Sequence, residues 1–317
     1  MGFEITPKDI ELLTLINRCG AVTNEQAKMI YGAETKLYLK RLVRLSTNHI
    51  VSRSGGYVEI TEKGSGILNQ EKRVRIKKWE RPYRAAMAQL IFDLPDWEIE
   101  FGTEIKRRIE INRGSKIAAV IRKGGIRYGI YQLLYDDPDQ DRIGFVWKDL
   151  QELPQDNGCP DRAVIIYRSD TAIKTMFEKV KACEPTMNEI LLVHSNTSLT
   201  LLDRYHGTEF TSLLLQRFPG LTHSHRKLAQ YKYKDDYVCV QAFHDAVAMK
   251  YLHNYYNGFG HKSEGRLVNI VCTDNTSKYL RELFPHAKFH IISDDLTRFK
   301  PVPRTILRPS LLTATKQ

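Results

Sequence analysis

The N-terminal part of the chain reads as three short helices followed by a β-hairpin, and this order strongly restricts the fold. Thr6 suits an N-cap, Pro7 suits the first helical position, and Gly20 suits the end of that helix. Thr23 and Gln26 have the spacing of a capping box, which predicts that a second helix begins immediately. This helix should end near Ile30, before Gly32, and a third should span roughly Glu34 to Leu45.

A hairpin is predicted directly after the third helix. The β-rich runs around Ile50–Arg53 and Tyr57–Ile60 are separated by Ser54-Gly55-Gly56, and adjacent glycines favour a tight turn. Three helices followed by a two-stranded wing are typical of a winged helix-turn-helix. In that fold the third helix lies in the DNA major groove and the wing contacts the backbone.

Excess positive charge is concentrated in the same part of the sequence. Residues 1–86 contain 16 Lys and Arg against 9 Asp and Glu, whereas the rest of the chain contains 32 against 28. A localised positive field beside a helix that can enter a groove is typical of nucleic-acid binding. A small helical domain that uses a solvated basic face for protein contacts is the simpler alternative.

The residues expected to contact double-stranded DNA lie on the third helix, the wing and a basic connector. The connector, Glu71–Arg84, alternates basic and apolar residues around Arg73–Lys77, which predicts a strand with one charged face that follows phosphates. The predicted contact residues are Lys36, Tyr38, Lys40, Arg41, Arg44, Arg53, Arg73, Arg75, Lys77 and Lys78.

The remainder of the chain has a mixed α and β pattern that occurs twice. Each half reads as hairpin, helix, strand, helix, strand, and the buried strands around Val164 and Val268 are offset by 104 residues. Similar turns follow them, Ser169-Asp170-Thr171 and Thr273-Asp274-Asn275. We therefore predict two related α/β units. The predicted domains are a winged helix at 1–70, a connector at 71–84, units at 85–195 and 196–298, and an extended basic tail at 299–317.

This order of elements resembles the replication-relaxation group of plasmid and mobile-element proteins, whose C-terminal part is similar to the PD-(D/E)xK nuclease core. The resemblance implies a hairpin whose carboxylates hold magnesium. Here the expected strands, Lys116–Val120 and Tyr128–Leu134, contain no Asp or Glu. Lys116 and Gln132 occupy the regions where acids would stand, and Gln241 lies on the equivalent strand of the second unit. We therefore expect a scaffold without catalytic carboxylates, metal or cofactor.

An enzymatic alternative comes from His223-Ser224-His225, which has the His-x-His spacing of rolling-circle initiators and relaxases. Tyr251 and Tyr255 follow on a predicted helix, and in such enzymes a tyrosine attacks the phosphodiester beside a metal ion. Surface histidines and core tyrosines explain the same residues without chemistry.

The main expectation is a sequence-specific DNA-binding protein that is not an enzyme. It would act in replication initiation, maintenance or transcriptional control of a bacterial plasmid, phage or integrative element. The α/β region would mediate homodimer or partner contacts. The five scattered cysteines and the lack of a signal-peptide or membrane-span pattern predict a cytoplasmic, nucleoid-associated protein without disulfides or a zinc site.

Overall fold

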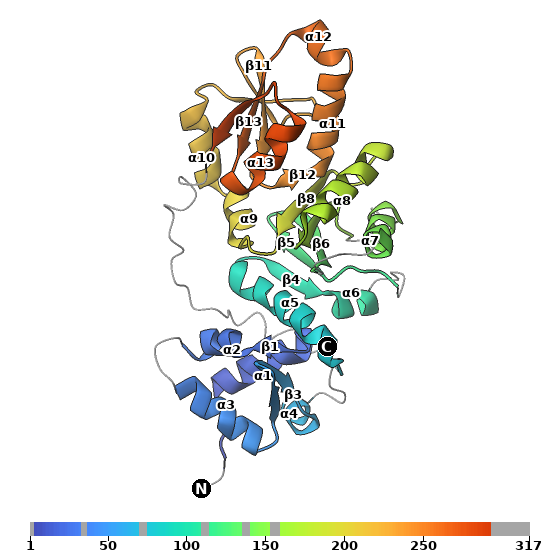
Figure 1. Cartoon of the computed structure of the whole chain (residues 1–317). Helices are drawn as coiled ribbons and strands as arrows, with labels where there is room; N and C mark the ends of the chain where they lie inside the picture. The colour runs from blue at the N-terminus through green and yellow to red at the C-terminus, as the bar shows by residue number, and fades with distance from the viewer. Residues whose placement is uncertain are drawn as a thin grey trace. The chain divides into compact units, whose positions relative to one another are not determined.

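The computed structural model describes residues 3–32, 37–69, 75–108, 114–134, 140–152 and 159–292 (Figure 1). The chain is a mixed α and β protein, as predicted, and it divides into two compact units, Met1–Glu110 with Arg304–Gln317 and Ile111–Pro303. No helix among the described residues combines the length and the apolar character that a bilayer crossing needs.

The first unit begins with the three predicted helices and the predicted hairpin, and it also has a short strand between the first two helices that was not predicted. Its elements are α1 (Pro7–Cys19), β1 (Val22–Thr23), α2 (Asn24–Tyr31), α3 (Leu37–Thr47), β2 (Val51–Ser54), β3 (Tyr57–Ile60), α4 (Glu62–Ile67), the 3₁₀ turn η1 (Lys78–Glu80), α5 (Arg81–Asp93), β4 (Glu98–Phe101) and α6 (Gly102–Arg108). We call residues 3–69 the N-terminal module. Its three strands form an antiparallel sheet in the order β1-β3-β2.

The predicted helix starts of the module are confirmed. Thr6 caps α1 and Thr23 caps α2, each through a reciprocal capping box that satisfies otherwise unpaired backbone N–H groups. Gly20 and Gly32 end these helices with positive φ. The third helix differs at its end, because α3 continues two residues past Leu45 to Thr47; the predicted start at Glu34 lies outside the described residues.

The hairpin also forms as predicted. Gly55 and Gly56 connect β2 to β3 with φ values of 58° and 82°. Positive φ at both central residues defines the type I′ turn, whose twist matches that of the flanking strands. Leu42 and Leu45 of α3, with Val51, Val58 and Ile60 of the hairpin, belong to the buried apolar residues of the module.

Two sequence predictions about the region after the hairpin are wrong. Residues 75–77 have no regular structure and Lys78–Glu80 form a 3₁₀ turn, so the described part of the connector is not a strand. Helix α5 belongs to the first unit instead of opening the α/β region, because it packs on α1 and β1. The buried Gln26 side chain donates to the carbonyl of Ala85 at 2.8 Å, and Arg18 pairs with Glu104 at 2.7 Å.

The second unit contains two sheets and their helices. Its elements are β5 (Ala119–Lys123), β6 (Ile126–Leu133), α7 (Gln140–Glu152), β7 (Arg162–Tyr167), α8 (Asp170–Ala182), β8 (Glu189–His194), α9 (Thr200–Tyr205), α10 (Thr208–Arg217), β9 (Thr222–His223), β10 (Tyr231–Tyr233), β11 (Asp236–Gln241), β12 (His244–Asp245), α11 (Ala246–Asn257), α12 (Gly260–Glu264), β13 (Val268–Cys272), α13 (Asp274–Leu283) and β14 (Lys288–Ile291).

The same topology occurs in both sheets, as the repeated sequence pattern predicts. In the first, the antiparallel hairpin β5-β6 is followed in space by the parallel strands β7 and β8; in the second, β10-β11 is followed by β13 and β14. Ser169 and Thr273, the residues of the repeated turn, are the N-caps of α8 and α13. The first hairpin begins later than predicted, since its outer strand spans Ala119–Lys123 instead of Lys116–Val120.

The two sheets are joined within this unit. Strand β12 pairs with β8 of the first sheet and leads directly into α11, which covers the second sheet. Phe177 of α8 packs into the same core as Leu252 of α11. Figure 1 shows α10 and α11 on opposite sides of β11 and β13, in keeping with two separate apolar cores on the two faces of that sheet.

Candidate nucleic-acid interface

The outer face of α3 is exposed and carries cations without acids. Lys40 and Arg44 are exposed, and Leu37 and Val43 on the same helix are 63% and 51% exposed. At about 100° per residue, these four side chains and Thr47 fall within a sector of about 120°. Leu42 and Leu45 lie on the opposite side and are completely buried. We call Leu37, Lys40, Val43, Arg44 and Thr47 the outer face.

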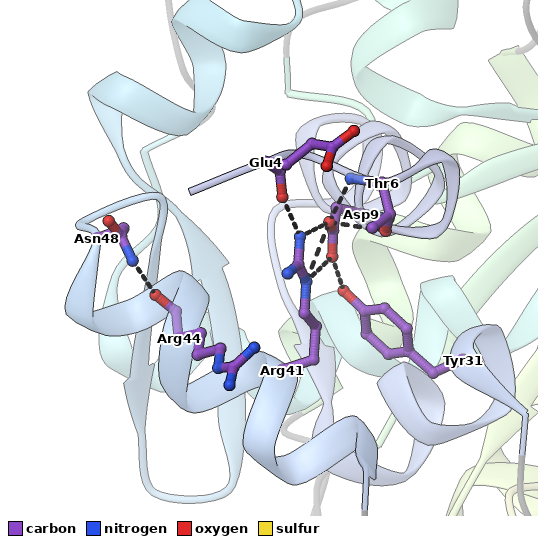
Figure 2. A network of polar contacts seen from close by, with 7 residues as sticks. All are labelled: Glu4, Thr6, Asp9, Tyr31, Arg41, Arg44 and Asn48. Atoms are coloured by element: carbon purple, nitrogen blue, oxygen red, sulfur yellow. Dashed lines mark hydrogen bonds and ion pairs between the residues drawn. The ribbon is translucent and has the colours of Figure 1, made fainter. Parts of the chain in front are cut away.

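The cations of the outer face are not neutralised by the module. Within the residues that the structure describes, neither the Lys40 ammonium nor the Arg44 guanidinium makes an ion pair or hydrogen bond, and Leu37–Thr47 contains no Asp or Glu. Arg44 contributes only its carbonyl, which accepts from Asn48 Nδ2 at 2.8 Å (Figure 2). The two charges are therefore available to an external anion.

Arg41 lies at the edge of this sector and turns inward. Its Nε donates to Asp9 Oδ1 at 2.9 Å, and its terminal nitrogen donates both to Asp9 and, at 2.6 Å, to the carbonyl of Glu4 (Figure 2). The centre of the Phe3 ring lies 4.6 Å from the guanidinium carbon of Arg41. Arg41 thus has an internal role that the sequence analysis, which placed it among the DNA contacts, did not predict.

Asp9 is the centre of this network. Its side chain is completely buried, and it accepts hydrogen bonds from Arg41, from the Tyr31 hydroxyl at 2.6 Å and from Thr6. Burial by itself raises the pKa of the Asp9 carboxyl, but the hydrogen bonds from Arg41, Tyr31 and Thr6 outweigh it, so the pKa lies below its ordinary value. The ionised carboxylate therefore ties α1, α2 and α3 together.

The hairpin presents an exposed tip and a partly covered arginine. Ser54, Gly55 and Gly56 are exposed, and apart from the chain neighbours no described atom lies within 4 Å of a Cβ built on either glycine. Arg53 is half-buried opposite Val58, and no described residue makes a hydrogen bond with its Nε. Tyr38 of α3 is also half-buried.

The predicted residues of the connector are divided. Arg75, Lys77 and Lys78 are exposed, and Arg75 lies 3.3 Å from Glu62 in an exposed ion pair. Such pairs contribute little to stability and are easily exchanged. Lys36 and Arg73 lie outside the described residues.

The expected nuclease-like positions in the second unit do not form a metal site. Gln132 is buried, and neither of its amide atoms has a partner among the described residues, whereas Gln241 accepts from the backbone N–H of Asp245 at 2.9 Å. The Lys116 ammonium lies 5.2 Å from the centre of the Phe145 ring. Among the described residues, no three His, Cys, Asp or Glu side chains are grouped in a way that could hold a metal ion.

The tyrosines of the nicking alternative have other partners. The Tyr255 ring is buried, and its hydroxyl donates to the carbonyl of Arg266 at 3.0 Å. The Tyr251 hydroxyl donates to Glu184 and accepts from Lys227 at 3.1 Å. Burial and the hydrogen bond to Glu184 raise the pKa of Tyr251, which disfavours the phenolate that a nucleophile requires. His223 and His225 are exposed, and the centres of the His223 and Tyr231 rings lie 5.1 Å apart.

A partly buried polar cluster in the second unit was not predicted. Tyr128, Arg162 and Glu189 occupy one register row across β6, β7 and β8. The Tyr128 hydroxyl donates to Glu189 and lies 2.8 Å from His206 Nε2. Burial raises the pKa of Glu189 and lowers that of His206 to about 4. This row lies where β7 and β8 begin, whereas ligands of α/β sheets bind at the carboxyl ends of strands, so we assign the cluster a structural role.

Comparison with protein-family models, with curated proteins and with solved structures finds no match to this chain.

Proposed function

We propose that the N-terminal module is a winged helix-turn-helix that binds duplex DNA, with α3 as the recognition helix and the β2-β3 hairpin as the wing. The proposal is supported by the order α1-β1-α2-α3-β2-β3 and the sheet order β1-β3-β2. In proteins of this plan the third helix enters the major groove.

The observation that carries the proposal is the outer face of α3. Two exposed cations stand there, no described Asp or Glu pairs with either of them, and Leu42 and Leu45 on the opposite side of the helix are buried in the core. The outer face is the side that a groove can accept. We assign base and phosphate contacts to Lys40 and Arg44, with the wing tip on the adjoining backbone. Arg75, Lys77 and Lys78 supply further phosphate contacts.

Arg41 has a supporting role in this proposal. Because its guanidinium is held by Asp9 and the Glu4 carbonyl, it orients α3 on α1 instead of contacting bases. The proposed biological setting remains replication initiation, maintenance or transcriptional control of a mobile element.

The test is selection of duplexes from a random library by the full chain, followed by titration of the best duplex at fixed salt. We expect the Lys40→Ala, Arg44→Ala double variant to lose at least about tenfold in affinity. Lys278→Ala is the matched control, because Lys278 is an exposed cation on α13 of the second unit. Equal affinity of the double variant and the wild type would refute the assignment.

A further inference from the structure

The outer face of α3 combines its two cations with two large apolar side chains. Leu37 is 63% and Val43 is 51% exposed. Exposed apolar residues are common singly, but here both stand in one helical sector with Lys40 and Arg44. The surface that complements this face must therefore be anionic and must also offer small apolar groups.

The major groove of B-DNA has this combination of properties. Phosphates line its edges, and each thymine presents a 5-methyl group on its floor. Resting on the proposed function, we infer that Leu37 and Val43 read thymine methyl groups, so that the preferred duplex contains thymines facing these two side chains.

The helix geometry gives an expected spacing. Six residues separate Leu37 from Val43, which places them about 9 Å apart along the helix axis. Because base pairs stack about 3.4 Å apart along the DNA axis, the two thymine contacts should lie at most about three base-pair steps apart. Lys40 and Arg44 lie between and beside them and face guanine edges or phosphates.

The experiment replaces thymine by deoxyuracil, one position at a time, in the best duplex selected by the full chain. This exchange removes a methyl group and leaves charge and base pairing unchanged. We expect the wild type to lose about fourfold in affinity at each contacted position. Leu37→Ala should abolish the discrimination at one position and Val43→Ala at the other. Arg44→Ala should bind more weakly overall but retain both discriminations.

The outcomes separate this inference from the proposed function. A wild type that binds duplex DNA with steep salt dependence but equally at thymine and deoxyuracil would overturn the inference and leave the proposed function standing. Absence of duplex binding would overturn both. A third outcome is that the wild type self-associates, that Leu37→Lys abolishes this association, and that duplex binding is insensitive to the methyl groups. This outcome would assign Leu37 and Val43 to contacts with a second copy of the chain. Both residues are exposed, so the alanine variants should retain the wild-type circular dichroism spectrum.

Discussion

Arg41 is the ion-pair partner of Asp9, a completely buried carboxylate 32 residues earlier in the chain. The pair joins the first turn of α1 to the middle of α3. Removing one partner of such a pair leaves an uncompensated buried charge, which costs more than the pair itself contributes. The position of α3, and with it the outer face, therefore depends on a side chain that points away from that face.

We predict that Arg41→Ala lowers the stability of the N-terminal module by about 3 kcal/mol. Hydrogen exchange followed by mass spectrometry on peptides from α1 and α3 measures this locally in the full chain. Arg44→Ala is the matched control, since it removes an exposed guanidinium from the same helix and should change protection by less than about 0.5 kcal/mol. Equal protection in the two variants would show that the Asp9 network does not support the module.

The parts of the module that were predicted correctly depend on local signals. The capping boxes at Thr6 and Thr23 and the glycine pair at the wing act over three or four residues, so the sequence alone contains the information. The repeat in the second unit was recognisable for the same reason, because Ser169 and Thr273 are local N-caps that follow buried strands.

What could not be predicted depends on contacts between distant residues. No spacing rule links Arg41 to Asp9, and Arg41 was predicted to contact DNA because it is one of the hydrogen-bond donors along the third helix. Likewise, the hydrogen bond from Gln26 to Ala85 attaches α5 to the first unit across 59 positions. The alternation at Arg73–Lys77 suggested a strand, but no neighbouring strand pairs with its described part, Arg75–Lys77, which stays irregular.

The two glycines of α4 should respond oppositely to alanine. A Cβ at Gly64 would lie 2.2 Å from the carbonyl oxygen of Ile50, a backbone atom that also accepts from the Thr61 hydroxyl. At Gly66, by contrast, no described atom outside its chain neighbours and its own helix backbone lies within 4 Å of such a Cβ. Gly64→Ala should therefore destabilise the module by at least about 2 kcal/mol. Gly66→Ala should be neutral or stabilise it by up to about 1 kcal/mol, because alanine lowers the entropy of the unfolded chain. Thermal unfolding of both variants checks this, and a tolerated Gly64→Ala would contradict the close packing of α4 on the hairpin.

Asp245 should make the second unit less stable as the pH rises. Burial, then the nearby charge of Glu189, raises the pKa of its carboxyl well above the ordinary value of 3.8. The folded state thus holds a proton that the unfolded state releases, and stability falls as the pH rises from about 4 toward the raised pKa. Asp245 also caps α11 by accepting from the Val247 N–H at 3.0 Å, which asparagine can do equally well.

We therefore predict that the free energy of unfolding of Asp245→Asn, relative to that of the wild type, increases by about 1–2 kcal/mol between pH 5 and pH 8. Urea unfolding at several pH values measures the difference. Asp170→Asn is the control, because it makes the same exchange at an exposed carboxylate, in the first turn of α8. Parallel profiles for Asp245→Asn and the wild type would mean that this carboxyl is ionised in the folded protein.

The salt dependence of the proposed DNA binding should show which cations of the outer face contact phosphates. Binding of a cation to a phosphate releases condensed counterions, so the slope of log affinity against log salt falls by about 0.9 for each phosphate of B-DNA that a variant no longer neutralises. Arg44→Ala and Lys40→Ala should each reduce this slope by up to about 0.9. Arg41→Ala should leave the slope of the folded fraction unchanged, because Asp9 neutralises the Arg41 guanidinium in the wild type. A reduction of about 0.9 in folded Arg41→Ala would show that Arg41 leaves Asp9 for a phosphate on binding. An unchanged slope in both Arg44→Ala and Lys40→Ala would place the phosphate contacts on the wing and connector instead.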